Sequence, residues 1–287
     1  MELCRTISEV RQVVAAARKA GRTIGVVPTM GALHAGHASL IDAAVRDGHF
    51  VVVTIFVNPL QFGPREDLAK YPRSPQADLA LCAAHGAGAV FHPSVEEVYP
   101  RPTLTAVAVP SLAEGLCGRS RPIHFAGVCV VVSKLFNIVL PEAAYFGQKD
   151  AQQAAIIRRM AEDLNFPVRV VVCPIVREGD GLAMSSRNVY LTADQRSQAP
   201  ALYASLQMAA RRIGQGPAPA GEVQAGMREL LARQASLGEV DYIEIVDPGT
   251  LQPVEMIDQP VLIALAVKFG ATRLIDNLVV DVPSPRA

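Results

Sequence analysis

Short apolar runs that alternate with helical patterns are the feature that most restricts the fold of this chain. Each run is rich in Val, Ile, Ala or Phe and lacks the polar alternation of a half-exposed strand. Such runs are typical of parallel strands that are buried on both faces. Strands that alternate with helices predict an α/β fold built on a doubly wound parallel sheet. The expected strands cover residues 23–27, 49–57, 89–93, 143–147 and 168–172.

Helical patterns fill the intervals between these runs. Ser8 is expected to cap the first helix and Gly21 to end it. Another helix is expected over 37–47, directly after the first long loop, because apolar residues recur there at helical spacing. The most apolar window, 127–140, is short and contains Lys134, so it predicts a buried helix or strand rather than a membrane span.

The pattern changes near residue 176. A loop and a helix are followed by the turn-rich linker 214–221 and a second helix. Three strand-like runs then follow one another, at 240–247, 259–270 and 271–280. Helices followed by consecutive strands predict a small α+β domain. We therefore expect a larger domain over residues 1–175 and a smaller C-terminal domain over 176–287.

Composition narrows the class of protein. With 287 residues, 50% of them hydrophobic, the chain can bury a substantial core. Lys and Arg number 27, as do Asp and Glu, so no basic excess indicates a nucleic-acid partner. The five cysteines are scattered and form no CxxC pair, which argues against structural zinc and a disulfide framework. The charged amino-terminal segment lacks an apolar stretch, and we expect a cytoplasmic protein with no membrane partner.

Three polar loops, which start at Pro28, Asn58 and Gly147, each follow an expected strand. The carboxyl ends of parallel strands meet at one edge of a sheet, and ligands of doubly wound folds bind there. The sequence therefore predicts that these loops gather at one edge and form a site.

Two histidines three residues apart mark the first of these loops, in the stretch PTMGALHAGH. His34 and His37 would stand at the start of a helix, where backbone N–H groups and the helix dipole favour anions. The pair could bind a metal, act as acid and base, hold a phosphate or face solvent. Its place at a strand-to-helix turn favours function over a capping role, and the absence of a third ligand nearby in sequence disfavours a metal.

Polar clusters in the other loops add candidates. Asn58 and Gln61 could hold a hydroxyl or a carboxylate, although Asn-Pro is also a common turn. In FGQKDAQQ, Lys149 suits a phosphate, whereas Asp150 could simply cap a helix. The MSSRN stretch, residues 184–188, would suit a polyphosphate, although a Ser-rich stretch is commonly only a loop.

Two further stretches carry weaker signals. In RPIHF, a supporting or gating role for Arg121 and His124 competes with an ordinary surface loop. Acidic, basic and aromatic residues around DLAKYPR are expected to be mainly structural: Asp67, Tyr71, Arg73 and Asp78.

A set of motifs occurs in a fixed order across nearly the whole chain. The motifs are PTMGALHAGH, FVNPLQF, DLAKYPR, RPIHFAGV, KLFNIV, FGQKDAQQ, GLAMSSRN and TRLIDN. The ordered set resembles the pantothenate synthetase (pantoate–β-alanine ligase) family, within the wider HxGH nucleotidyltransferase superfamily. The departures are small: Gln148 is often Glu in that family, and Val130 is often Thr.

The resemblance implies a reaction in two steps. Pantoate would attack the α-phosphorus of ATP to form pantoyl adenylate and pyrophosphate, and β-alanine would then displace AMP to form pantothenate. It also implies Mg²⁺ bound mainly through the ATP phosphates with no protein metal site assigned, a Rossmann-like first domain, a C-terminal lid domain and a homodimer.

Site residues follow from the resemblance by motif. Four residues would be catalytic, with His37 as the position usually assigned as proton donor: His34, His37, Lys149 and Arg187. ATP would also contact Met30, Gly31, Ala32, Leu33, Ala35, Gly36, Gly147, Gln148, Asp150, Val176, Met184, Ser185 and Ser186. Pantoate and β-alanine would be bound by Gln61 and Gln153, supported by Asn58, Tyr71, Arg121 and His124.

Two other functions remain as alternatives. The chain could be a nucleotidyltransferase that stops at the transferred nucleotide, which product analysis with and without β-alanine would reveal. It could also be a non-catalytic nucleotide sensor, for which we would expect a broken motif, and the motifs are intact.

Overall fold

The computed structural model describes residues 1–64, 66 and 68–283, so the predicted role of Asp67 lies outside the described residues. The chain forms two compact units. The first consists of Met1–Ala113, Arg121–Gln148 and Gln153–Pro174, and the second of Glu114–Ser120, Lys149–Gln152 and the chain from Ile175 onward. The second unit therefore takes in two short segments that the predicted division after residue 175 assigned to the first domain.

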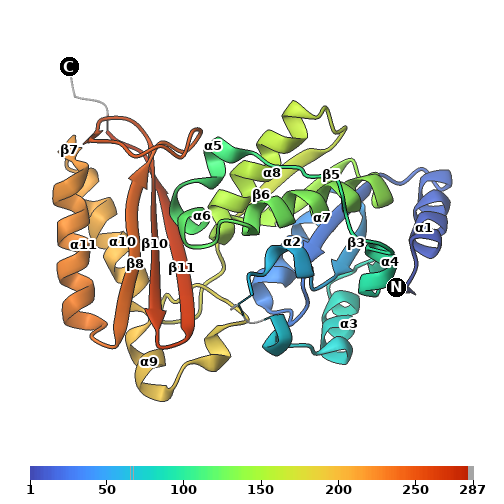
Figure 1. The fold of residues 1–287 in the computed structure, drawn as a ribbon, viewed down its shortest axis with the longest axis horizontal. Coiled ribbons are helices and arrows are strands. Elements are labelled where there is room, and N and C mark those ends of the chain that lie inside the picture. Colours follow the sequence, from blue (N-terminus) through green and yellow to red (C-terminus); the bar gives the residue numbers. More distant parts are fainter. Residues whose placement is uncertain (65, 67, 284–287) are drawn as a thin grey trace. The chain divides into compact units, whose positions relative to one another are not determined.

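A six-stranded sheet forms the centre of the first unit, and all its neighbouring strands are parallel (Figure 1). The strand order is β1-β4-β3-β2-β5-β6. Their bounds are β1 Glu2–Cys4, β2 Ile24–Thr29, β3 Phe50–Ile55, β4 Ala89–Phe91, β5 Ala143–Gly147 and β6 Arg169–Cys173. The predicted doubly wound α/β fold is confirmed. The edge strand β1 was not predicted.

The order of the strands creates a switch point beside β2. From β2 the chain adds β3 and β4 on one side, and it returns to add β5 and β6 on the other. Because such crossovers are right-handed, helices that connect strands in opposite directions cover opposite faces of the sheet. Ligands of doubly wound folds bind where the direction changes, outside the carboxyl ends of the strands. The loops after β2 and β5 stand at that place.

The helices of the first unit include the two that were expected before Gly21 and over 37–47. They are α1 Ile7–Lys19, α2 Ala35–Arg46, α3 Pro75–Ala84, α4 Val95–Val98, α5 Pro110–Ala113, α7 His124–Val139 and most of α8 Ala151–Asp163. The expected cap at Ser8 is wrong. The N-cap is Thr6, because its hydroxyl accepts the Glu9 N–H while the Glu9 carboxylate accepts the Thr6 N–H.

The apolar window 127–140 forms most of α7. A buried helix was one of the two structures predicted for this window, the other being a buried strand. This helix buries Val128, Val132 and Leu135 and packs against α1 and β2. Among the described residues, no helix has the length and apolarity needed to cross a membrane. The window is therefore part of the core of the first unit.

An antiparallel sheet in the order β11-β10-β8 organises the second unit. The long strands are β8 Gly238–Val246, β10 Val261–Phe269 and β11 Thr272–Val280, with a small pair formed by β7 Ala218–Pro219 and β9 Met256–Ile257. The helices are α6 Leu116–Ser120, α9 Ala193–Gln198, α10 Ala201–Ile213 and α11 Ala220–Gln234. The predicted succession of helices and then strands is confirmed.

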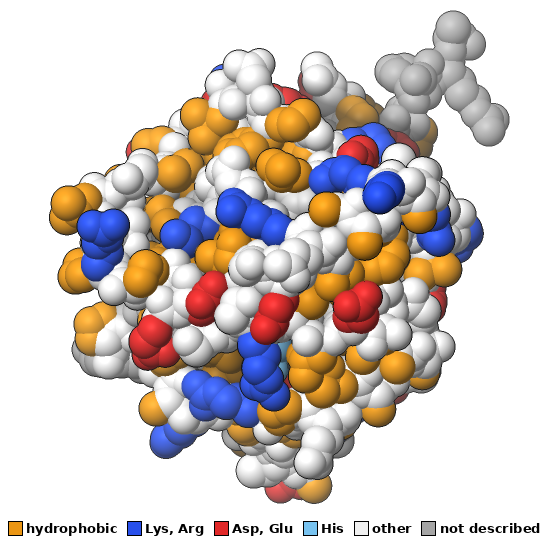
Figure 2. Space-filling model, turned by 90° about the vertical axis from the view of Figure 1, so that its right-hand side faces the viewer, with side chains coloured by type: hydrophobic (Ala, Val, Ile, Leu, Met, Phe, Trp, Pro, Cys, Tyr) orange, Lys and Arg blue, Asp and Glu red, His pale blue; other side chains and the backbone are white. Residues whose placement is uncertain are grey.

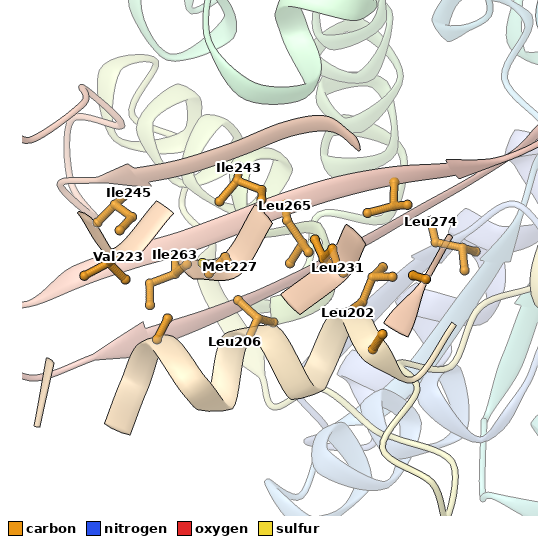
Figure 3. Packing of buried hydrophobic residues seen from close by; sticks show 14 of the residues in the cluster. Leu202, Leu206, Val223, Met227, Leu231, Ile243, Ile245, Ile263, Leu265 and Leu274 are labelled. Carbon is orange, nitrogen blue, oxygen red and sulfur yellow. The ribbon is translucent and has the colours of Figure 1, made fainter. Parts of the chain in front are cut away.

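One face of this sheet and two helices make the core of the second unit (Figure 3). Ile243, Ile263 and Leu265 point from the strands toward Leu206 of α10 and Met227 of α11. The five side chains are almost fully buried. Burying an aliphatic side chain of this size stabilises a fold by about 1.5–3 kcal/mol. The second unit therefore has a hydrophobic core of its own.

Charged side chains of both signs are interspersed on the face of the molecule shown in Figure 2. Hydrophobic side chains lie between them, and neither sign covers a large continuous area of that face. The sequence as a whole has equal numbers of basic and acidic residues, 27 of each.

Candidate active site

The loop after β2 has an unusual backbone that a buried carboxylate holds in place. Gly31 and Ala32 have positive φ angles of 87° and 50°. The Asp78 carboxylate accepts the Ala32 N–H at 3.0 Å and the Leu33 N–H at 2.8 Å, and its side chain lies in the interior. A positive φ is costly for a residue with a Cβ atom, so the bonds to Asp78 stabilise a conformation that Ala32 would otherwise avoid.

His34 and His37 cap the first turn of α2 reciprocally. His34 is the N-cap, and its Nδ1 accepts the Gly36 N–H at 3.1 Å. The His37 Nδ1 in turn accepts the His34 N–H at 3.3 Å. The two ring centroids lie 4.1 Å apart. The arrangement repeats the hydrogen-bond pattern of a capping box, with imidazoles in place of the usual hydroxyl and carboxylate.

The capping role of these histidines is thus observed, and the turn that they cap also has features that favour an anion. The first turn of α2 carries backbone N–H groups and the positive end of the helix dipole, and both favour an anion. Both imidazoles are half-buried at this point. In the described part of the chain, no group of three His, Cys, Asp or Glu side chains forms a metal site. The geometry of this turn therefore favours an anion.

Asn58 and Gln61 form a buried amide pair directly after β3. The Asn58 Nδ2 donates to the Gln61 Oε1 at 3.1 Å and to the Gly127 carbonyl at 3.0 Å. The Asn58 Oδ1 accepts the Tyr99 hydroxyl at 2.9 Å. The Gln61 Nε2 lies 3.1 Å from the Met30 Sδ in the loop after β2. The predicted meeting of the loops after β2 and β3 is thus observed within the first unit.

Close packing also fixes the backbone of this turn. Gly127 of α7 lies so near Leu60 that a Cβ atom at this glycine would overlap the Leu60 carbonyl and crowd the Gln61 nitrogen. The absence of a side chain at position 127 lets α7 approach the turn and accept the Asn58 hydrogen bond.

Arg121 and His124 both donate to the backbone carbonyl of Gln61. The His124 Nδ1 lies 3.0 Å from this oxygen and the Arg121 Nη2 lies 3.3 Å from it. Arg121 also forms two 2.7 Å hydrogen bonds to the Glu66 carboxylate. Burial raises the pKa of Glu66, but the bonds and charge of Arg121 outweigh this effect and leave that pKa below its usual value. The Glu66–Arg121–Gln61 chain holds the turn that carries the Gln61 amide.

Tyr71 lies behind the same turn. Its side chain is buried and its ring stands 6.0 Å from that of Phe62, edge to face. Tyr71 therefore packs beside the residue that follows Gln61.

Lys149 belongs to the second unit, where β11 anchors its backbone. The Asn277 Nδ2 donates to the Lys149 carbonyl at 2.9 Å. Next to it, the Asp276 carboxylate accepts two bonds from Arg177, at 2.6 and 3.0 Å. Burial raises the pKa of Asp276, and the charges of Arg177 and Lys149 act in the opposite direction. The TRLIDN motif therefore orders the segment that carries Lys149.

The MSSRN loop is fixed by a polar network within the second unit. The Met184 N–H donates to the Val176 carbonyl at 3.0 Å, which brings two predicted ATP contacts together. The Asn188 Nδ2 donates to the Glu178 Oε1 at 2.7 Å, and Glu178 is paired with Arg196 at 2.6 Å. The Ser185 hydroxyl accepts the Arg187 N–H at 3.2 Å.

Gln152, another residue of FGQKDAQQ, has a structural role in the second unit. Its Oε1 accepts the Cys117 N–H at 3.0 Å, and its Nε2 donates to the Gly115 carbonyl at 2.9 Å. The side chain is buried. Gln152 therefore ties Gly115 and the start of α6 to the start of α8.

Sequence reasoning missed several residues that organise these sites. It expected Asp78 to be mainly structural, which its contacts support, but it did not link this residue to the histidine loop. It did not single out Glu66, Tyr99 or Asp276. Each makes its contact across a long separation in sequence, so no local spacing could have revealed it.

The chain matches the family model described as Pantoate-beta-alanine ligase over residues 2–279. A pantothenate synthetase from Moorella thermoacetica is 53% identical over 282 residues, which cover 98% of this chain and 99% of the relative. The corresponding protein from Desulfitobacterium hafniense is 52% identical over 281 residues, with 98% and 99% of the two chains covered.

Solved structures give the same result. The pantothenate synthetase of Thermus thermophilus superimposes with a TM-score of 0.91 at 45% identity, over 97% of this chain and 99% of that one. A pantoate-beta-alanine ligase from Francisella tularensis, complexed with beta-gamma ATP and beta-alanine, has a TM-score of 0.79 at 32% identity and 97% coverage of both chains.

Proposed function

Because this chain belongs to the pantoate–beta-alanine ligase family, we propose that it forms pantothenate through a pantoyl adenylate. It is an ATP-dependent ligase that joins pantoate to β-alanine. The main structural support for the adenylate mechanism is the turn after β2. There, two imidazoles and the first-turn N–H groups of α2 stand at the carboxyl end of a central strand.

In the first step, an oxygen of the pantoate carboxylate forms a bond to the α-phosphorus of ATP. The bond from this phosphorus to the bridging oxygen breaks, and its electron pair leaves with pyrophosphate. Charge grows on the phosphate oxygens, so the main task of the protein is to hold the reactants in line and stabilise that charge. His34 and His37 are proposed to donate hydrogen bonds to these oxygens.

Lys149 and Arg187 are the cationic groups of the proposal. Lys149 would stabilise the charge that develops on the phosphates, and Arg187 would contact the nucleotide from the MSSRN loop. A lysine acts as a point charge and an arginine as a fork of donors, so the two are suited to different phosphate geometries. The remaining proposed ATP contacts are Met30, Gly31, Ala32, Leu33, Ala35, Gly36, Gly147, Gln148, Asp150, Val176, Met184, Ser185 and Ser186.

Pantoate is proposed to bind at Gln61 and Gln153. The amide pair of Asn58 and Gln61 supports this assignment, because an orientated amide can bond a hydroxyl or a carboxylate without bringing its own charge. Arg121 and His124 would act through the Gln61 carbonyl, which is the group they contact. Their contribution would be to position Gln61.

In the second step, the β-alanine amine attacks the acyl carbon of the adenylate. The C–N bond forms, the C–O bond breaks with its electron pair on AMP, and the nitrogen loses a proton to water. Mixed anhydrides of this kind react readily with water, so exclusion of solvent would protect the intermediate.

Magnesium would arrive with ATP. Mg²⁺ usually keeps several waters and binds through substrate phosphates with one or two carboxylates, so it requires no protein cage. We further propose a homodimer that works in the cytoplasm, where ATP is available.

Exchange of labelled pyrophosphate into ATP tests the proposal. With pantoate and Mg²⁺ present and β-alanine absent, we expect exchange that depends on pantoate. If the folded protein forms pantothenate but shows no such exchange, the proposal that it forms an adenylate reversibly and releases pyrophosphate is wrong.

A further inference from the structure

The hydrogen bonds of the two histidines fix the position of their ring protons. The Nδ1 of His34 accepts the Gly36 N–H, and the Nδ1 of His37 accepts the His34 N–H. A ring nitrogen that accepts a hydrogen bond through its lone pair carries no proton, so a neutral ring must hold its proton on Nε2. Turning either ring over would place a C–H group against a backbone N–H and leave that donor without its acceptor.

The surroundings also disfavour a positive charge on these rings. Both stand at the N-terminus of α2, where the helix dipole is positive and raises the free energy of a nearby cation. The centroids are 4.1 Å apart, so two imidazolium ions would repel each other strongly. The carboxylate of Asp78, which holds the same loop, is directed at the backbone N–H groups of Ala32 and Leu33.

We infer that His34 and His37 act as neutral imidazoles with the proton on Nε2, and that neither transfers a proton in either step. This inference rests on the proposed function for the identity of the acceptor, which is ATP phosphate. It replaces the expectation that His37 is the proton donor. Each histidine presents one fixed N–H donor, and the reciprocal cap prevents the ring from becoming an acid through Nδ1.

The chemistry of both steps is compatible with this role. Pantoate enters the first step as a carboxylate, and pyrophosphate leaves as an anion, so no proton has to move. In the second step, the amine proton must go elsewhere, because Nδ1 is occupied by a backbone donor and Nε2 already carries its proton. Fixed donors aimed at developing charge stabilise a transition state without reorganisation, and the loss of one commonly costs about 10²–10³-fold in rate.

Long-range ¹H–¹⁵N correlation spectra of the free, ¹⁵N-labelled protein test the tautomer directly. At pH 7.5 we expect His34 and His37, assigned through His34→Gln and His37→Gln, to show protonated Nε2 and unprotonated Nδ1. His124 is an internal control with the opposite pattern, because its Nδ1 lies 3.0 Å from the Gln61 carbonyl and must donate. A protonated Nδ1 on either of the paired rings would overturn the inference.

A pair of substitutions at position 37 tests the chemical role. In His37→Gln the amide can accept the His34 N–H and still donate a hydrogen bond, but it cannot act as an acid. His37→Leu has neither group. We expect the Gln variant to catalyse pyrophosphate exchange at least tenfold faster than the Leu variant, at equal melting temperature or after correction for the folded fraction.

Equal loss of exchange in the two folded variants would show that proton transfer is required and would overturn the inference. The spectra do not depend on turnover. Failure of the wild-type protein to exchange pyrophosphate would therefore refute the proposed function and leave the tautomer result intact.

Discussion

Replacement of Asp78 by asparagine is the sharpest perturbation of the histidine loop. The Asp78 carboxylate makes two charge-assisted hydrogen bonds, at 2.8 and 3.0 Å, to consecutive backbone N–H groups, and its side chain is only 2% exposed. Asparagine has nearly the same shape but offers one acceptor oxygen. Its NH₂ group would face the second backbone N–H, so one bond is lost and two donors oppose each other.

The expected cost follows from these contacts. A hydrogen bond to a charged group contributes about 1.5–3 kcal/mol, and leaving a buried donor unsatisfied costs a similar amount. We therefore expect Asp78→Asn to lower the free energy of unfolding by about 2–3 kcal/mol. Because the loop also orients His34 and His37, we expect kcat/KM for ATP to fall at least tenfold, which corresponds to about 1.4 kcal/mol of binding or transition-state energy.

Urea unfolding and pantoate-dependent pyrophosphate exchange measure the two effects. Asp42→Asn is the matched control, because Asp42 pairs with His85 at the surface, where its side chain is 53% exposed. Such pairs contribute about 0–1 kcal/mol. The reasoning is wrong if Asp78→Asn and Asp42→Asn unfold at the same urea concentration and use ATP equally well.

Three further substitutions address the other contacts. Glu66→Gln should raise the pantoate KM about tenfold and leave the ATP KM unchanged, since it weakens the hold of Arg121 on the Gln61 turn. The pKa of Glu66 is lowered from 4.5, so the ionised carboxylate stabilises the wild-type protein. The difference in unfolding free energy between the wild type and this variant should therefore be largest above pH 4.5 and shrink as the pH falls below it. Urea titrations at several pH values measure this difference. Asn277→Ala should lower kcat for exchange several-fold at constant pantoate KM, because the Lys149 carbonyl loses its hydrogen bond from Asn277. A normal kcat would show that Asn277 does not position Lys149. Arg187→Ala should raise the ATP KM, and an unchanged ATP dependence would place Arg187 away from the nucleotide.

Much of the fold could be predicted because parallel strands carry a strong signal. The Val-rich runs of β2 and β3 are buried along nearly their whole length, so they lack the polar alternation of half-exposed strands. Strand β1 is only three residues long and two of them are exposed, so its sequence has neither the run nor the alternation. The cap of α1 was misplaced although the Thr6–Glu9 spacing of a capping box is present in the sequence.

The candidate site could be predicted in part. The residue types of PTMGALHAGH and FVNPLQF, and their place after strands, indicated that the two loops would meet. A supporting role was expected for Arg121, but its contacts could not be predicted, because one of them is to a carbonyl 60 residues away in the chain. Likewise, the sequence suggested either a cap or a ligand contact for His34, and only the hydrogen bonds show that the cap directs Nε2 away from the helix backbone.

The central claim is that an oxygen atom of pantoate becomes bonded to the α-phosphorus of ATP. Pantoate labelled with ¹⁸O in its carboxylate tests this most directly, with AMP and pyrophosphate analysed by mass spectrometry after a single turnover with β-alanine. The account predicts one ¹⁸O atom in AMP and none in pyrophosphate. Label-free AMP alongside newly formed pantothenate would contradict it.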